Sequence, residues 1–281
     1  MEREDNKHRR EISFNEDNHV DVKNEFITAE YPDGMKAADM KMLRFVISQC
    51  RKGDKEFYEY EFSAADIAEY MNMDRHNLYR DALDMAEKRL FNCNLRIGTK
   101  SKHRLIHLFK RCTYQNGKFT MRMDEEAASL FLGLRGNFTE IPIAPILEMK
   151  NKNSIRIYEL ICQKFMSHYP YADCAKVIDI PLKELREITE TAGKKSYDHT
   201  GHLKNKILIP SLAEVEEAAG WKIVLKDIKR GRRIIGFTLE VWSRSGWEVT
   251  EKYKREGKLP DWMEQKDLPG QMSIFEFIGD V

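Results

Sequence analysis

The same order of local sequence patterns occurs twice along the chain, and this repeat restricts the folds that it can adopt. Each copy begins with a helical pattern, continues through a short strand and a pair of helices, and ends in two strands. In the first copy the pattern predicts helices over 35–51, 64–71 and 75–91, and strands over 57–62, 103–112 and 118–123. Asn116-Gly117, between the last two strands, is a strong signal for a tight hairpin.

Two details of the first copy predict specific packing. Ser63, with Asp66 three residues later, resembles a capping box at the start of the helix over 64–71. In the next helix Tyr79, Leu83, Ala86 and Leu90 are spaced 4, 3 and 4 residues apart. This spacing predicts that the four side chains share one buried face.

The second copy follows the first without obvious residue identity. It predicts a helix over 153–167, a strand over 176–180, and a helix that starts at Pro181 and ends before Gly193. A further helix runs from about Tyr197 to Gly220, and Pro210 should kink it. Strands over 221–228 and 233–242 close the copy. A strand, two helices and a two-stranded wing are typical of a winged helix–turn–helix.

We therefore expect an α+β fold of two tandem winged helix–turn–helix domains. Residues 1–23 should form a flexible N-terminal arm, and 24–145 a first domain. Residues 146–246 should form a second domain for sequence-specific DNA binding. The Pro- and Gly-containing stretch 247–281 should be a flexible tail.

Positive charge is concentrated between Lys194 and Arg233, although the formal net charge of the whole chain is only +1. Affinity for DNA depends on cations placed against phosphates, so this local concentration favours a DNA-binding surface. The candidate residues of the second domain are Lys194, Lys195, Ser196, Tyr197, His199, His202 and Lys206 on the helix, and Lys229, Arg230, Arg232 and Arg233 at the wing tip. A solvated amphipathic helix and a solubilising turn are the simpler alternatives.

Within this segment Lys195, His199, His202 and Lys206 are spaced 4, 3 and 4 residues apart, which predicts a common helix face opposite Leu203 and Ile207. Cations and imidazoles together suit contacts to phosphates and base edges. The cluster Lys229-Arg230-Gly231-Arg232-Arg233 suits contacts to the DNA backbone or the minor groove.

The first domain has a weaker signal for DNA binding. Its candidate residues are Arg75, His76, Asn77 and Arg80 at a helix start, and Lys100, Lys102 and Arg104 near a strand. Asp81, Asp84 and Glu87 follow the helix start and would repel phosphate, whereas the stretch from Lys100 to Arg111 contains no acidic residue. We therefore expect backbone contacts or a role in protein interaction.

The sequence contains no motif of a known enzyme class. It lacks a phosphate-binding Gly-x-x-x-x-Gly-Lys-Ser/Thr loop and a nucleophile elbow, so we expect neither catalysis nor a cofactor. His103 and His107 share a strand face, but no thiol or carboxylate lies nearby in the sequence, and we expect no metal site. Five scattered cysteines and the lack of a long apolar run favour a cytoplasmic protein with reduced thiols and no membrane contact.

The order of these segments resembles that of the iteron-binding plasmid replication initiators. The best local match to their Ser-Ile-Arg-x-Tyr-Glu-Leu motif is Asn153-Ser154-Ile155-Arg156-Ile157-Tyr158-Glu159-Leu160. Leu182 to Arg186, Tyr197 to Pro210 with Glu214, Lys229 to Arg232 and Ile235 to Phe237 resemble later segments, so that the resemblance covers about 24–242. It implies binding of direct repeats in double-stranded origin DNA, melting of AT-rich DNA and recruitment of the host helicase. It also implies dimers, formed through the first domain, that repress their own promoter.

The tail carries a second resemblance. Gln271, Met272, Ser273, Ile274 and Phe275 look like the Gln-Leu-Ser-Leu-Phe pentapeptide that binds the bacterial sliding clamp, with departures at Met272 and Ile274. A tail that packs on its own domain is the simpler alternative. For the whole chain, the alternatives are a winged-helix transcriptional regulator and, with less support, a DNA nicking or recombination enzyme.

Overall fold

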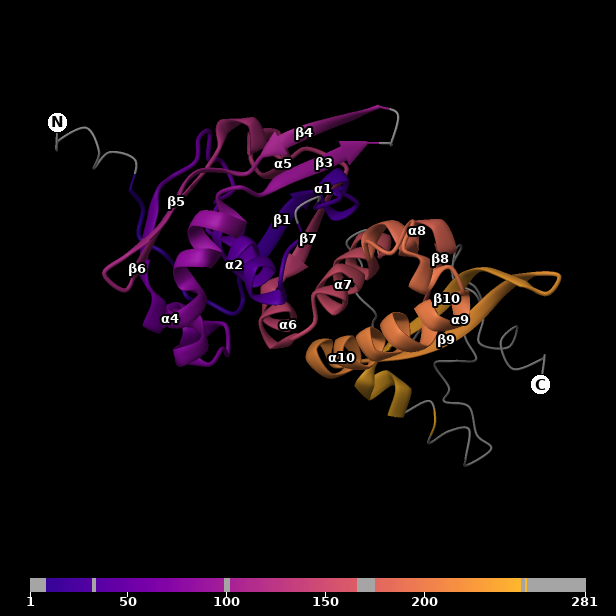
Figure 1. The fold of residues 1–281 in the computed structure, drawn as a ribbon. Helices are drawn as coiled ribbons and strands as arrows, with labels where there is room; N and C mark the ends of the chain where they lie inside the picture. Colours follow the sequence, from indigo (N-terminus) through magenta and orange to yellow (C-terminus); the bar gives the residue numbers. More distant parts are fainter. Residues whose placement is uncertain (1–8, 32–33, 99–101, 166–174, 249–250, 252–281) are drawn as a thin grey trace.

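The computed structural model describes residues 9–31, 34–98, 102–165, 175–248 and 251. Its elements form two units joined through one long helix (Figure 1). The first unit contains the helices and helical turns α1 (Asn24–Ile27), α2 (Ala37–Ser48), α3 (Ala64–Tyr70), α4 (Arg75–Leu83), η2 (Asp84–Leu90), η3 (Glu125–Ala127), α5 (Ala128–Phe131) and α6 (Ile143–Glu148). Its strands are β1 (His19–Lys23), β2 (Tyr60–Ser63), β3 (Asn94–Gly98), β4 (His103–His107), β5 (Phe109–Gln115), β6 (Lys118–Met123) and β7 (Phe138–Pro142).

The first unit contains three small antiparallel sheets, and α2 packs against β1 of one of them. The three sheets have the strand orders β1-β7, β3-β4 and β2-β6-β5. Alternation along β6 buries Phe119, Met121 and Met123, because successive side chains of a strand point to opposite faces. The winged helix–turn–helix is formed by α3, α4 and the β5–β6 hairpin. Its turn at Asn116-Gly117 has φ of 53° and 76°, which confirms the predicted tight hairpin.

The second unit repeats this arrangement with fewer strands. It contains α7 (Lys152–Lys164), β8 (Lys176–Pro181), α8 (Leu182–Ile188), η4 (Lys195–Tyr197), α9 (Thr200–Leu203), η5 (Lys204–Leu208), α10 (Ile209–Ala219), β9 (Trp221–Arg230) and β10 (Arg233–Ser243). Its single sheet has the order β8-β10-β9. The predicted α+β fold with two winged helix–turn–helix domains is therefore confirmed.

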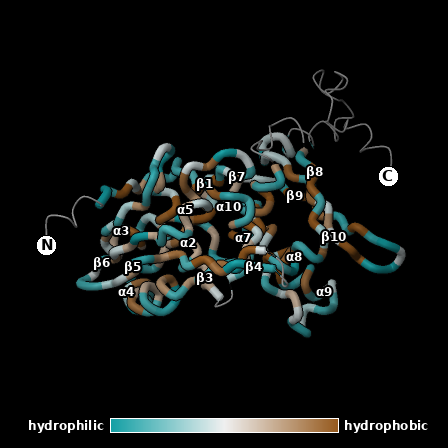
Figure 2. Tube along the Cα trace, turned by 90° about the horizontal axis from the view of Figure 1, so that it is seen from above, coloured by the Kyte–Doolittle hydropathy of each residue, from teal (hydrophilic) through white to brown (hydrophobic). Residues whose placement is uncertain are grey.

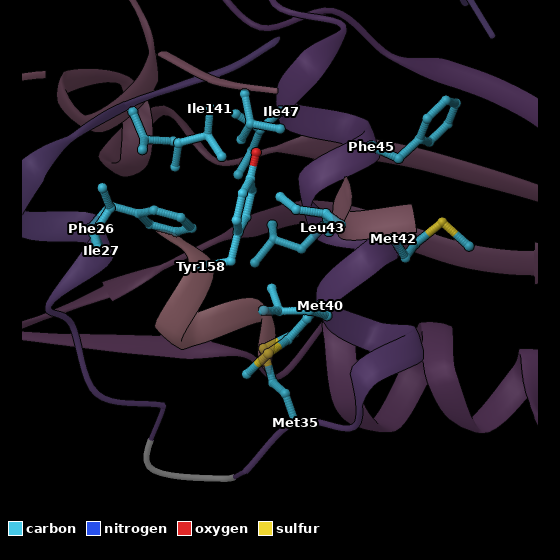
Figure 3. Close-up of a cluster of buried hydrophobic side chains, with 14 of the residues drawn as sticks. Phe26, Ile27, Met35, Met40, Met42, Leu43, Phe45, Ile47, Ile141 and Tyr158 are labelled. Atoms are coloured by element: carbon cyan, nitrogen blue, oxygen red, sulfur yellow. The ribbon is translucent and has the colours of Figure 1, made fainter. Parts of the chain in front are cut away.

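Helix α7 is the structural link between the two units. Tyr158 lies among Phe26, Leu43 and Ile141 of the first unit (Figure 3), and its ring centroid is also 5.4 Å from that of Trp221 in the second unit. Helix α10 packs along α7 on the other side. The same helix thus contributes to both cores.

A buried ion pair reinforces this joint. The guanidinium of Arg44, on α2, donates to both carboxylate oxygens of Glu159, on α7, at 2.7 and 2.9 Å. Both side chains are fully buried. Arg156 also lies beside Glu159, at 3.7 Å, and donates to the backbone oxygens of Ala29 and Ile188. The joint therefore contains two guanidinium groups around one carboxylate.

Several local predictions are confirmed and others are wrong. Ser63 caps α3 and accepts a hydrogen bond from the Asp66 amide at 3.0 Å, as predicted. Residues 19–23, expected to be part of a loose arm, instead form β1 against β7. The strand predicted over 103–112 is two strands, since β4 pairs with β3 and β5 pairs with β6. A partner distant in sequence decides the first outcome, whereas β4 and β5 each pair with a different strand close to them in sequence.

A turn of π-helix explains one further error. Tyr79 and Leu83 are 43% and 49% exposed, because the buried residues of α4 and η2 follow the spacing Leu78, Ala82, Ala86 and Leu90. A π-turn is wider than an α-helical turn, so the buried positions follow one another in steps of four residues. The sequence prediction assumed 3.6 residues per turn and therefore placed the neighbouring face of the helix in the core. Before Pro210 the π-turn η5 continues directly into α10, and Pro210 stands in the first turn of that helix.

Candidate nucleic-acid interface

The wing of the second unit projects beyond its own sheet (Figure 1). Strand β8 accompanies β10 only from Gly236 to Val241, whereas β9 and β10 remain paired out to Arg230 and Arg233. At the tip Gly231 has φ of 62°, a conformation that glycine adopts without strain. All residues of the predicted tip, Lys229 to Arg233, are exposed, and Figure 2 shows this tip as hydrophilic.

The helix before the wing is less regular than predicted. Lys195 lies in the short 3-10 turn η4, and His199 is the N-cap of α9, so the expected continuous face from Lys195 to Lys206 is wrong. In the sequence Lys-Ser-Tyr-Asp-His, the half-buried Tyr197 is the one residue that can hold a regular helical turn against the core. The other four residues are polar and give the turn no such anchor. Lys194, Lys195 and Ser196 remain exposed on this turn.

His199, His202 and Lys206 do lie together on the exposed side of the helical segment. The two imidazole rings are 5.4 Å apart between centroids, and His202 Nδ1 is 3.3 Å from the backbone oxygen of Ser196. Leu203 and Ile207 are buried on the opposite side, as predicted. The arrangement offers imidazole donors and acceptors beside a cation, which suits contacts to base edges and phosphates.

The cations between Lys194 and Arg233 separate into paired and unpaired groups. Lys204, Lys222 and Lys226 form ion pairs with Asp227, Glu216 and Glu240. Within the described part of the chain, no ion pair engages Lys194, Lys195, Lys206, Lys229, Arg230, Arg232 or Arg233. These seven cations occupy the helix turn and the wing tip, where they are free to meet phosphates.

The first unit has the opposite charge arrangement. Arg104 pairs with Glu25 at 2.6 Å, Arg111 with Glu59 at 2.7 Å, and Lys110 with Glu125 at 3.4 Å. The stretch from Lys100 to Arg111 contains no acidic residue itself, but Glu25, Glu59 and Glu125 from other segments pair with its cations. Lys102 is exposed, and Lys100 lies outside the described residues.

The start of α4 is an exposed and cationic part of the first unit. Asp74 caps the helix through the Asn77 amide at 2.7 Å, and Arg75, His76, Asn77 and Arg80 are all exposed. Arg80 donates to Asn77 Oδ1 at 2.9 Å. The neighbouring hairpin has no projecting wing, because β2 pairs with β6 as far as Lys118. Lys118 itself is bound to Glu61 at 2.9 Å.

Other candidate features lie outside this interface or are absent from the described residues. The tail motif Gln271 to Phe275 lies outside the described residues. Among the residues that the structure describes, no three His, Cys, Asp or Glu side chains form a possible metal site. No helix in the described ranges is both long enough and apolar enough to cross a membrane. Sequence reasoning also missed the Lys204–Asp227 contact, for which local patterns give no signal.

Comparisons with known proteins agree with this architecture. Residues 19–162 match the family model described as "Initiator Replication protein, WH1", and residues 181–241 match "Initiator Rep protein, WH2". Among curated proteins no sequence matches the chain.

The solved structures include proteins of similar fold. The crystal structure of Pi initiator protein in complex with iteron DNA matches with a TM-score of 0.65 at 16% identity, covering 81% of this chain and 98% of that one. Domains 2 and 3 of RctB match with a TM-score of 0.37 at 12% identity, covering 65% of this chain and 72% of that one. From the two family matches, we conclude that the chain belongs to the family of initiator replication proteins with WH1 and WH2 domains.

Proposed function

We propose that the protein is a plasmid replication initiator that binds short direct repeats in origin DNA through its second unit. The observation that carries this proposal is the set of seven unpaired cations on the helix turn and wing. The fold shared with Pi initiator protein, whose structure contains iteron DNA, supports it. A chain with a net charge of only +1 that concentrates free cations on one helix–wing surface has a local surface suited to DNA.

In this proposal the two parts of the surface have different roles. The segment with His199, His202 and Lys206 enters the major groove, where imidazoles reach base edges. The wing tip, with Arg230, Arg232 and Arg233, follows the phosphate backbone or the adjacent minor groove. The helix then determines sequence preference, and the wing contributes affinity for any DNA.

The first unit has a supporting role in this proposal. Arg75 and Arg80 contact the DNA backbone, because they are the exposed cations at the start of its helix. The pairing of Arg104, Lys110 and Arg111 with acids leaves that strand region better suited to protein contacts than to phosphate. Dimerisation through this unit, with repression of the protein's own promoter, follows from the family resemblance.

Origin melting and recruitment of the host helicase complete the proposed role, and both rest on the family resemblance. The tail motif from Gln271 to Phe275 adds a proposed contact with the sliding clamp. This contact is tested by comparing clamp binding of the full chain with that of a version ending at Leu268. Equal binding by the two proteins would contradict the tail proposal and leave DNA binding unaffected.

Footprinting on the DNA that flanks the protein's own gene tests the proposal. Protection of several direct repeats beside an AT-rich stretch is the expected result. Protection of a single palindrome would instead indicate a transcriptional regulator. Covalent attachment of the protein to supercoiled DNA would indicate a nicking enzyme.

A further inference from the structure

We propose that the Lys204–Asp227 ion pair sets the position of the recognition segment relative to the wing, and thereby the sequence specificity of the second unit. Lys204 is a positioning residue in this proposal and does not contact phosphate. The inference rests on the proposed DNA-binding function, because it assigns a role within that same surface.

The recognition segment needs an external support. Helix α9 contains only four residues before the π-turn η5, of which Lys204 is the first residue, and η5 continues into α10. Short helical segments and π-turns have little intrinsic stability. Leu203 and Ile207 anchor one side of the segment in the core. On the wing side of the segment, the ion pair of Lys204 with Asp227 is a direct tie to β9.

The wing needs a support at its base for a similar reason. Beyond Gly236, toward the tip, no third strand among the described residues lies beside the β9–β10 ribbon, and the register shifts between Ile234 and Gly236. A bulge of this kind changes the direction of a two-stranded ribbon. Asp227 lies opposite Phe237 in the β9–β10 ladder, next to Gly236 on the side away from the tip. At this position β8 still pairs with β10. A contact to Asp227 therefore acts on the last fully supported part of the wing.

The geometry of the pair suits a tie between the two elements. Lys204 Nζ lies 2.6 Å from Asp227 Oδ1, and the side chains are only 25% and 21% exposed. The ammonium is also 5.9 Å from the ring centroid of the buried Phe237. Partial burial reduces screening by water and salt, so this contact is more persistent than a pair on the open surface.

The charges also separate the role of Lys204 from that of its neighbours. Lys204 neutralises Asp227, the acid nearest to the wing base in β9, while Lys206 and the wing cations remain unpaired. Loss of the tie would leave those phosphate-binding cations in place but change the angle between helix and wing. Specific binding should then weaken more than binding to arbitrary DNA.

The test compares variants on two DNA probes. The first is a 30-bp duplex containing a sequence selected by the wild type from a random pool, and the second is a shuffled duplex of the same composition. Asp227→Asn should weaken binding to the selected duplex by about tenfold, the equivalent of one misplaced base contact. The affinity for the shuffled duplex should not decrease. The dependence of DNA affinity on salt concentration should not decrease either. Lys204→Met should behave alike, and the double variant should be no worse than either single variant.

Two controls complete the design. Lys204→Arg keeps the cation and should retain specificity. Lys222→Met removes a comparable pair with Glu216, at 2.9 Å, that links β9 to α10 away from the wing, and it should leave the ratio of the two affinities unchanged. Near-ultraviolet circular dichroism verifies that each variant is folded.

Two results would overturn the proposal. If Asp227 only repels DNA and Lys204 is an available cation, Asp227→Asn would bind both duplexes more tightly, and the proposal would be overturned. A reduced salt dependence in Lys204→Met would also overturn it, because Lys204 would then be a phosphate contact. If the wild type selects no sequence from the pool, the proposed function itself fails.

Discussion

Replacement of Glu159 by glutamine tests the buried joint between the two units. Glu159 accepts two hydrogen bonds from Arg44, at 2.7 and 2.9 Å, and both side chains are 0% exposed. The carboxylate holds the pKa of Arg44 above its usual value despite the opposing effect of burial. Glutamine preserves the shape of the side chain but leaves Arg44 and Arg156 charged, buried and without an anion.

The expected cost follows from the geometry. Removing one partner of a buried ion pair destabilises a protein by about 3–5 kcal/mol. For a chain of this size that corresponds to a fall in Tm of roughly 6–20 °C. Thermal unfolding followed by circular dichroism at fixed protein concentration measures this shift. Because α7 contributes to both cores, the loss should affect the unfolding of both units.

A matched control separates this effect from a general loss of charge. Glu217, on α10, is 84% exposed and lies 3.5 Å from Arg244. Glu217→Gln should change the free energy of unfolding by less than about 0.5 kcal/mol, as is usual for exposed positions. The double variant Arg44→Met/Glu159→Leu should recover part of the stability lost in Glu159→Gln, since both charges of the pair are then removed. A Glu159→Gln protein that unfolds within about 2 °C of the wild type would refute the reasoning, because that shift is under 1 kcal/mol for a chain of this size.

Three further predictions concern local structure. Ser63→Ala removes the cap of α3 and should lower the free energy of unfolding by about 1 kcal/mol in urea titrations, whereas Ser63→Asp should retain most of it. Gly117→Ala should cost about 1 kcal/mol, because φ at this position is 76°; no change would argue against the tight turn. Burial lowers the pKa of Lys41 from 10.5 to about 8, so the unfolded chain binds more protons than the folded one between these pH values. The stability of the wild type relative to Lys41→Met should therefore rise from pH 8 to 10.5, and a flat difference would contradict this account.

Local sequence patterns predict the winged helices because the relevant signals are short in range. The alternation in β6, the turn at Asn116-Gly117 and the Ser63 cap each depend on fewer than ten neighbouring residues, and all three are present in the structure. The wing tip of the second unit is equally local, since its cations and glycine are consecutive.

Features set by distant residues were not predictable in this way. The pairing of β1 with β7 joins segments more than a hundred residues apart. The π-turn in η2 is a separate case, in which an irregular helix moves the buried face away from Tyr79 and Leu83. The cations of the first unit looked free in sequence because Glu25 and Glu59 are far from Arg104 and Arg111 along the chain. A count of neighbouring charges does not reveal such pairs.

The dependence of DNA binding on salt tests most directly the claim that unpaired cations of the second unit hold the DNA. The wild type is compared with a wing variant, Arg230→Ala/Arg232→Ala/Arg233→Ala. The matched control variant is Arg104→Ala/Lys110→Ala/Arg111→Ala, which removes three cations that are paired with acids in the wild type. The wing variant should bind all duplexes more weakly, and the slope of log K against log salt should become shallower by about 2–3. The control should keep the slope of the wild type. An unchanged slope in the wing variant, or an equal loss in the control, would contradict the account.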